Sequence, residues 1–179
     1  MNDYAEKHIK DGYFDFASLI NDDFVLAIKQ LYNAKHYTSA LKLLLSFIDS
    51  MAFVAYGDCT QQIFKQGLAV YAHLISVSIT ADQLWRHRNS LLHMSTYESR
   101  RVQAGTIAKL VPYVGINSPT TPAQGFRYYS LYDLIQTVMT GTGKYILALD
   151  VSEPMRECFC GNYEKIISDS HMVIDQNEA

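Results

Sequence analysis

The sequence predicts a mainly α-helical protein: a helical bundle with a short β-hairpin or extended loop inserted around residues 106–131. Apolar residues recur at helical spacing through most of the chain. Turn-forming and capping residues separate these segments. One stretch is instead rich in β-forming residues on both sides of the turn sequence "NSPTTPAQ".

The composition is that of a globular protein, with 49% hydrophobic and 18% charged residues among 179. This length suits a single domain over residues 1–179. We expect residues 20–103 to form its helical core, and residues 104–179 to supply the hairpin or loop and the C-terminal helices. The net charge of -3 excludes broad electrostatic attraction to nucleic acid, so any contact with RNA must be local or need two chains.

The cysteines and the N-terminus predict the compartment. Three cysteines, with one C-x-C pair, suggest neither a disulfide framework nor a zinc site. The N-terminus lacks the features of a signal peptide. The longest apolar run, "LAVYAHLISVSI", has about 12 residues, too few to span a bilayer. We therefore expect a reduced, cytoplasmic protein with no membrane segment, metal or cofactor.

The first two predicted helices precede residue 57. Residues 22–34 have helical spacing, and Asn21 or Asp22 could cap their N-terminus. Residues 37–56 repeat the pattern, and Gly57 ends it.

Two further helices are predicted before the β-rich stretch. Residues 60–79 are apolar nearly all round and are therefore expected to be buried. Thr80 or Asp82 could cap a fourth helix that runs to about residue 102.

Helical spacing returns after the β-rich stretch. The segment 130–150 is predicted to be a helix interrupted at Gly-Thr-Gly, and residues 154–173 a last amphipathic helix. The sequence "TGTGK" lacks the spacing of a phosphate-binding loop. The aromatic cluster "FRYYSLY", Phe126 to Tyr132, could stack on bases, although we favour packing in the core or an interface.

The segment "LWRHRNSLLHM", Leu84 to Met94, carries an arginine where an apolar residue is expected. On a helical wheel, Arg88 lies in the middle of an arc formed by leucines and Trp85. Burying an unpaired guanidinium costs several kcal/mol, so Arg88 needs an acidic partner, a subunit interface or a bound anion.

A second stripe of this helix carries Asn89 and His93, which are four residues apart and therefore neighbours. Arg88 and His93 are separated by about 140° on an ideal helix. They can serve one site only if the arginine side chain bends round, the helix is irregular, or a second chain completes the site. The alternative is an arginine at a helix edge and an unrelated structural histidine, pointing to separate environments.

"RNSLLH", Arg88 to His93, resembles the R-x4-6-H motif of HEPN domains, in which a polar residue such as Asn89 often follows the arginine. The motif of this superfamily lies on a late helix of an all-α bundle. The resemblance covers about residues 20–103. Some toxins of the superfamily carry a tyrosine two residues after the histidine. Here that position is Ser95.

The resemblance implies a metal-independent ribonuclease with a role in defence or as a toxin, acting as a homodimer whose two motifs face one cleft. It implies RNA as substrate and an antitoxin-like protein as a partner. An alternative is a HEPN-like module without catalysis, which uses the same helices for dimerisation or partner binding.

The residues fit that chemistry. His93 would move a proton, Arg88 would stabilise charge on the phosphate, and Asn89 would orient His93 or donate to phosphate. Residues that could support the motif are Asp49, Arg86 and Tyr97, and residues that could guide the RNA backbone are Arg100 and Arg101. Asp49 either pairs with Arg88 or His93 or is simply solvated at a helix edge.

Overall fold

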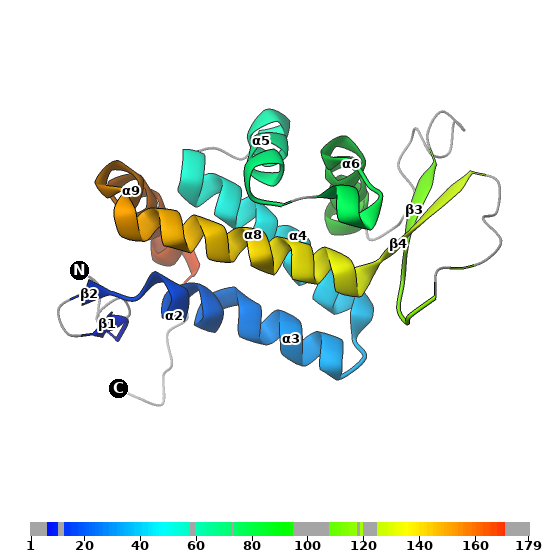
Figure 1. Cartoon of the computed structure of the whole chain (residues 1–179), viewed down its shortest axis with the longest axis horizontal. Helices are drawn as coiled ribbons and strands as arrows, with labels where there is room; N and C mark the ends of the chain where they lie inside the picture. Colours follow the sequence, from blue (N-terminus) through cyan, green and yellow to red (C-terminus); the bar gives the residue numbers. More distant parts are fainter. Residues whose placement is uncertain are drawn as a thin grey trace.

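A computed structural model of the chain describes residues 7–10, 13–57, 60–72, 74–94, 108–117, 119 and 125–170. These residues are mainly helical, with two small two-stranded sheets, as Figure 1 shows. In chain order the elements are β1 (Ile9–Lys10), β2 (Tyr13–Phe14), α2 (Phe16–Ile20), the π-helical turn η1 (Asn21–Val25), α3 (Leu26–Asn33), α4 (Tyr37–Tyr56), α5 (Gln61–Tyr71), the 3-10 turn η2 (Leu74–Val77), α6 (Ala81–Met94), β3 (Lys109–Tyr113), β4 (Phe126–Ser130), α8 (Leu131–Val151) and α9 (Glu153–Ser170). The mainly helical fold predicted from the sequence is confirmed.

Helix α4 lies at the centre of the bundle and contacts α3, α5, α6, α8 and α9. Its predicted bounds, 37–56, are confirmed. Gly57 ends it in the left-handed conformation, with φ of 75°, where its N–H donates to the Phe53 carbonyl over 2.7 Å. The buried side chains of α4 join one core with residues from α2 through α9.

Helix α4 is also long and apolar enough, by length and composition alone, to cross a bilayer. Half of its most apolar window is buried inside the protein. Its apolar face therefore packs on neighbouring helices. The core helix of a soluble protein can be equally long and apolar.

The first helical segment begins earlier than the predicted 22–34. Asp15, rather than Asn21 or Asp22, is the N-cap, and its side chain accepts a hydrogen bond from the Ser18 N–H over 2.9 Å. Helix continues from α2 through η1 into α3, because Phe16 and neighbouring apolar residues pack in the core. The antiparallel β1–β2 pair just before it was not predicted.

Helix α5 is shorter and less buried than the predicted helix over 60–79. The chain leaves helical conformation at Ala72, where φ is -127° and ψ is 117°, and a separate 3-10 turn follows. Gln61, Gln62 and Gln66 are exposed, so α5 has a solvent face. The prediction of a helix buried all round was wrong, because these glutamines give α5 a polar face.

Helix α6 begins with a reciprocal cap. The Thr80 hydroxyl accepts from the Gln83 N–H over 3.2 Å, and the Gln83 side chain accepts from the Thr80 N–H over 2.9 Å. Of the two predicted caps, Thr80 is therefore confirmed. Asp82 lies in the first turn instead and pairs with Lys65 and Arg86. The predicted extension to residue 102 lies outside the described residues beyond Met94.

The insertion predicted around 106–131 contains β3 and β4, which pair in parallel with Lys109 opposite Phe126. The connection is therefore not a hairpin, since hairpin strands are antiparallel. Residues 114–125, about a dozen, link the strands, which is the length that a parallel pair requires. The sheet lies beside α6 at one end of the molecule (Figure 1).

Helix α8 runs without interruption through Gly-Thr-Gly, contrary to the expected break. Gly141 and Thr142 are buried, and the Thr142 hydroxyl donates to the Val138 carbonyl over 2.9 Å. Tertiary packing thus outweighs the low helix propensity of glycine. The last helix, predicted over 154–173, is present as α9.

Candidate functional site

Four polar side chains predicted from the sequence converge between α6 and α4. Arg88 Nε donates to Asp49 Oδ2 over 2.6 Å, and Arg88 Nη2 forms an ion pair with the same oxygen. Arg88 Nη1 lies 2.7 Å from Asn89 Oδ1 and 3.0 Å from His93 Nε2. One guanidinium therefore joins the carboxylate of α4 to the amide and imidazole of α6.

The separation of Arg88 and His93 on the helical wheel is overcome by the arginine side chain. Helix α6 is an α-helix through both residues, so no helical irregularity is needed. The flexible arginine side chain bends round the helix until Nη1 reaches the His93 ring. The reading in which the two residues point to unrelated environments is wrong.

Asp49 is the acidic partner that Arg88 needed. The two side chains are only 13% and 16% exposed, so neither is the solvated group of a helix edge. Burial raises the pKa of the Asp49 carboxyl, while the hydrogen bond and charge of Arg88 oppose that rise. Removing either partner would leave a largely buried charge without its mate.

Trp85 is a further member of the cluster that the sequence reasoning did not assign to the site. The Arg88 guanidinium carbon lies 5.1 Å from the centroid of the Trp85 ring, in a cation–π contact. Trp85 in turn packs against Phe64 of α5. The spacing of three residues between Trp85 and Arg88 was the available signal, since such pairs are neighbours on a helix.

The contact between Arg88 and His93 fixes the role of one imidazole nitrogen. Arginine carries only donors, so His93 Nε2 accepts and holds no proton in this arrangement. His93 is solvent-exposed, whereas the Arg88 side chain is mostly covered. The cluster thus holds a ring nitrogen of an exposed histidine against a guanidinium that is itself paired with Asp49.

Arg86, the remaining candidate that the structure describes, is not part of this cluster. Arg86 donates instead to Asp82 over 2.7 Å, four residues earlier on α6. Lys65 and Arg86 hold the pKa of Asp82 well below its usual range, at about 2. Tyr97, Arg100 and Arg101 lie outside the described residues.

A buried histidine next to Arg88 ties the β3–β4 sheet to α6. His87 is 4% exposed, and its Nε2 lies 3.0 Å from the hydroxyl of Tyr129, a core residue of β4. Burial lowers the pKa of His87 to about 4, so the ring is neutral near pH 7. This contact was not predicted, because no local pattern relates residues so far apart.

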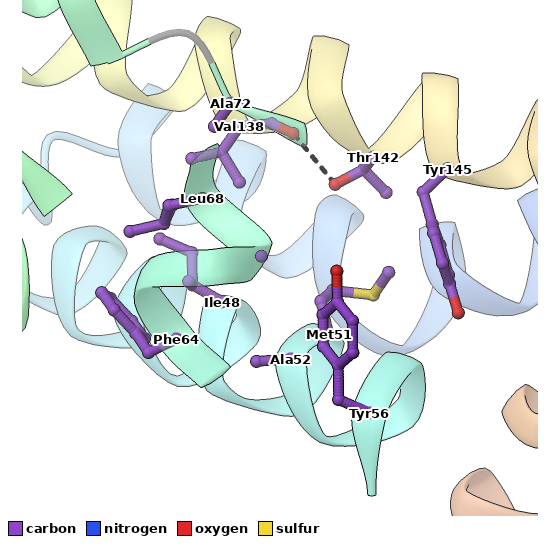
Figure 2. A pocket seen from close by; sticks show the side chains of 11 residues that line it. Ile48, Met51, Ala52, Tyr56, Phe64, Leu68, Ala72, Val138, Thr142 and Tyr145 are labelled. Atoms are coloured by element: carbon purple, nitrogen blue, oxygen red, sulfur yellow. Dashed lines mark hydrogen bonds between the residues drawn. The ribbon is translucent and has the colours of Figure 1, made fainter. Parts of the chain in front are cut away.

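An apolar pocket lies near the cluster but is separate from it. Figure 2 shows its walls, which α4, α5 and α8 supply around a cavity of about 40 Å³. The lining side chains are uncharged, and the Thr142 hydroxyl is engaged with Val138. Phosphate chemistry needs charged donors, so the Arg88 cluster, not this pocket, is the candidate reactive site.

Comparisons with protein-family models, with curated proteins and with solved structures found no match in any of the three.

Proposed function

We propose that the chain is a metal-independent endoribonuclease of HEPN type. The observation that carries this proposal is the convergence of Arg88, Asn89 and His93, with Arg88 Nη1 3.0 Å from His93 Nε2. These groups belong to the R-x4-6-H pattern that suggested the superfamily, and they form one cluster although an ideal helical wheel separates Arg88 from His93.

The proposed reaction begins with attack of a ribose 2′-hydroxyl oxygen on the adjacent phosphorus. His93 Nε2 accepts the hydroxyl proton, and Arg88 donates to the phosphate oxygens as negative charge accumulates. The bond between phosphorus and the 5′-oxygen breaks, and the leaving oxygen takes a proton from water, so the products carry a 2′,3′-cyclic phosphate and a 5′-hydroxyl. Substrate phosphate would replace His93 as the partner of Arg88 Nη1, which frees the single lone pair of His93 Nε2 for the proton, while Asp49 keeps the guanidinium in place.

The proposed assembly is a cytoplasmic homodimer in which two clusters share one cleft. Asp49 neutralises Arg88 within each cluster, so a shared cleft would not add net positive charge but would offer one phosphate a second Arg88 guanidinium. A defence or toxin role, with an antitoxin-like partner, belongs to the same proposal. Light scattering on the purified chain should give twice the monomer mass.

A second candidate function is a HEPN-like dimerisation or partner-binding module without catalysis. It is favoured by the engagement of Arg88 within its own chain, since Nε, Nη1 and Nη2 each contact Asp49, Asn89 or His93. In this reading the guanidinium is a structural tie between α4 and α6.

Cleavage in the presence of excess EDTA separates the two candidates. The full chain is incubated with single-stranded RNA and, in parallel, with DNA of the same sequence. The ribonuclease proposal expects cleavage of RNA alone, with 2′,3′-cyclic phosphate ends. Failure to cleave, cleavage of both polymers, or cleavage that EDTA abolishes would leave the binding module as the better reading.

A further inference from the structure

The β3–β4 sheet has two faces of different character. In a parallel sheet, residues paired in register lie on the same face, so Lys109 shares a face with Phe126, and Val111 with Tyr128. The opposite, inner face carries Leu110 and Tyr129, which are 4% and 1% exposed.

The inner face packs on the helical core. Tyr129 contacts the buried His87 of α6, and Arg127 Nη1 donates to the Gln83 side chain over 3.3 Å. The packing role expected for the aromatic cluster is therefore confirmed for Tyr129.

The outer face is partly exposed to solvent. Phe126 is 39% exposed, and Lys109, Val111, Tyr113 and Tyr128 are half-buried. Parallel sheets are usually covered on both faces, and two strands alone are marginally stable. This outer face is defined by Lys109, Val111, Tyr113, Phe126 and Tyr128, and it has the character of a binding surface.

We propose that the outer face of the β3–β4 sheet binds the bases of single-stranded RNA. The rings of Phe126 and Tyr128 are nearly parallel, at 14°, with centroids 6.5 Å apart. This separation exceeds the spacing of about 3.4 Å between nucleotides along one duplex strand, so the face suits an extended, unstacked strand. Aromatic side chains on a sheet that accept successive bases are typical of proteins that bind single strands.

Charge favours a nucleic acid over a protein partner at this face. The two strands carry no acidic residue, although the whole chain is acidic, and Lys109 lies on the outer face, whereas Arg127 is paired with Leu110 on the inner face. Lys109 Nζ lies 5.7 Å from the centroid of the Phe126 ring, so a positive charge accompanies the stacking surface. Stacking on an uncharged ring with a neighbouring cation suits a base and its phosphate together.

The surface is distinct from the Arg88 cluster, because the inner face lies between it and α6. It would hold the strand at a distance from the cleaved bond and add affinity without taking part in the chemistry. The inference rests on the proposed function only for the choice of RNA over DNA as the ligand.

The test measures binding of a fluorescein-labelled 20-nucleotide 2′-O-methyl RNA of mixed sequence to the full chain by fluorescence anisotropy. This probe has no free 2′-hydroxyl, so binding is measured whether or not the protein cleaves RNA. We expect Phe126→Leu and Tyr128→Leu each to raise Kd by at least about fivefold, since base stacking contributes about 1–3 kcal/mol per ring. Lys109→Ala should make the negative slope of log K against log salt concentration shallower by about 0.7, because one phosphate contact is lost.

Tyr13→Leu is the matched control. Tyr13 is a tyrosine of β2, 81% exposed, in the other two-stranded sheet, and its substitution should leave Kd unchanged. Leucine keeps apolar bulk at each position, and circular dichroism checks that each variant is folded.

Three results would overturn the inference. They are absence of binding by the wild type, binding that neither Phe126→Leu nor Tyr128→Leu weakens, and conversion of a dimer to monomers by these substitutions, which would make the face a protein interface. If the variants weaken binding but the wild type does not cleave RNA, the binding surface stands and the ribonuclease proposal falls. If the wild type cleaves RNA and the variants bind normally, only the binding surface falls.

Discussion

Acid should destabilise the protein through His87. The unfolded chain protonates this histidine below about pH 6.5, whereas burial keeps the folded-state pKa near 4. Between these values the unfolded state binds more protons, so the free energy of unfolding falls as the pH falls from about 6.5 to about 4. A difference of about 2.5 pKa units corresponds to about 3 kcal/mol at the acid end of this window.

Urea unfolding at about pH 7 and about pH 4.5 measures this loss, with His87→Gln as the comparison. Glutamine does not titrate but can still form a hydrogen bond with Tyr129. We expect the wild type to lose about 2–3 kcal/mol more than the variant between the two pH values. The raised pKa of Asp49 has the opposite effect, since it makes the free energy of unfolding rise as the pH falls. Asp49 is present in both proteins, so its effect cancels in the comparison. Equal losses in wild type and His87→Gln would refute the assignment of the acid sensitivity to His87.

Three further substitutions test the packing around the site, each by urea or thermal unfolding at about pH 7. Asp49→Ala should lower the free energy of unfolding by about 3 kcal/mol, because Arg88 stays mostly covered but loses its carboxylate partner. Asp82→Ala, at a more exposed ion pair, should lower it by less than about 1 kcal/mol. Equal losses would contradict the buried pairing. Gly67→Ala should raise the free energy of unfolding by about 0.5–1 kcal/mol, because alanine has a higher helix propensity than glycine and the added Cβ would lie 3.8 Å from its nearest neighbour. A lower free energy of unfolding would mean that the pocket wall cannot accept a methyl group. Thr80→Ala should cost about 1 kcal/mol by removing the cap of α6, and Thr80→Ser should restore most of it; an unaffected Thr80→Ala variant would show that the cap is dispensable.

The helical elements with clear local signals were predictable from the sequence. Helix α4 combines a long apolar periodicity with a terminal glycine, and its bounds matched. The cap at Thr80 follows the pattern of a Thr with Gln three residues later. Local propensity gave a wrong prediction where tertiary packing determines the conformation. Gly-Thr-Gly in α8 is helical because Gly141 and Thr142 are buried in the core.

The pairing of β3 with β4 could not be derived from local sequence. Strand propensity and a turn-rich link fit an antiparallel hairpin as well as a parallel pair, and the contact of Tyr129 with His87 joins residues 42 apart. Only the fold brings such residues together.

The site was partly predictable. The wheel showed that Arg88 needed a partner, and Asp49 was a candidate because it flanks the apolar side of its own helix. The wheel could not show that the side chain reaches His93, since it places Cα positions and ignores the length of an arginine. Trp85 was placed in the apolar arc, but its contact with the guanidinium depends on the same bend.

The rate of RNA cleavage by Arg88→Ala and His93→Ala tests the central claim most directly. Each variant is compared with the wild type in excess EDTA, after circular dichroism and urea unfolding show that it is folded. The loss of a general acid–base residue typically lowers the rate by about 10²–10⁴-fold, and we expect at least a 100-fold loss for His93→Ala and a comparable loss for Arg88→Ala. Asn21→Ala, an exposed substitution outside the cluster, should cleave as the wild type does. Equal cleavage by the wild type and both cluster variants would contradict the account, because it would place the activity outside Arg88 and His93.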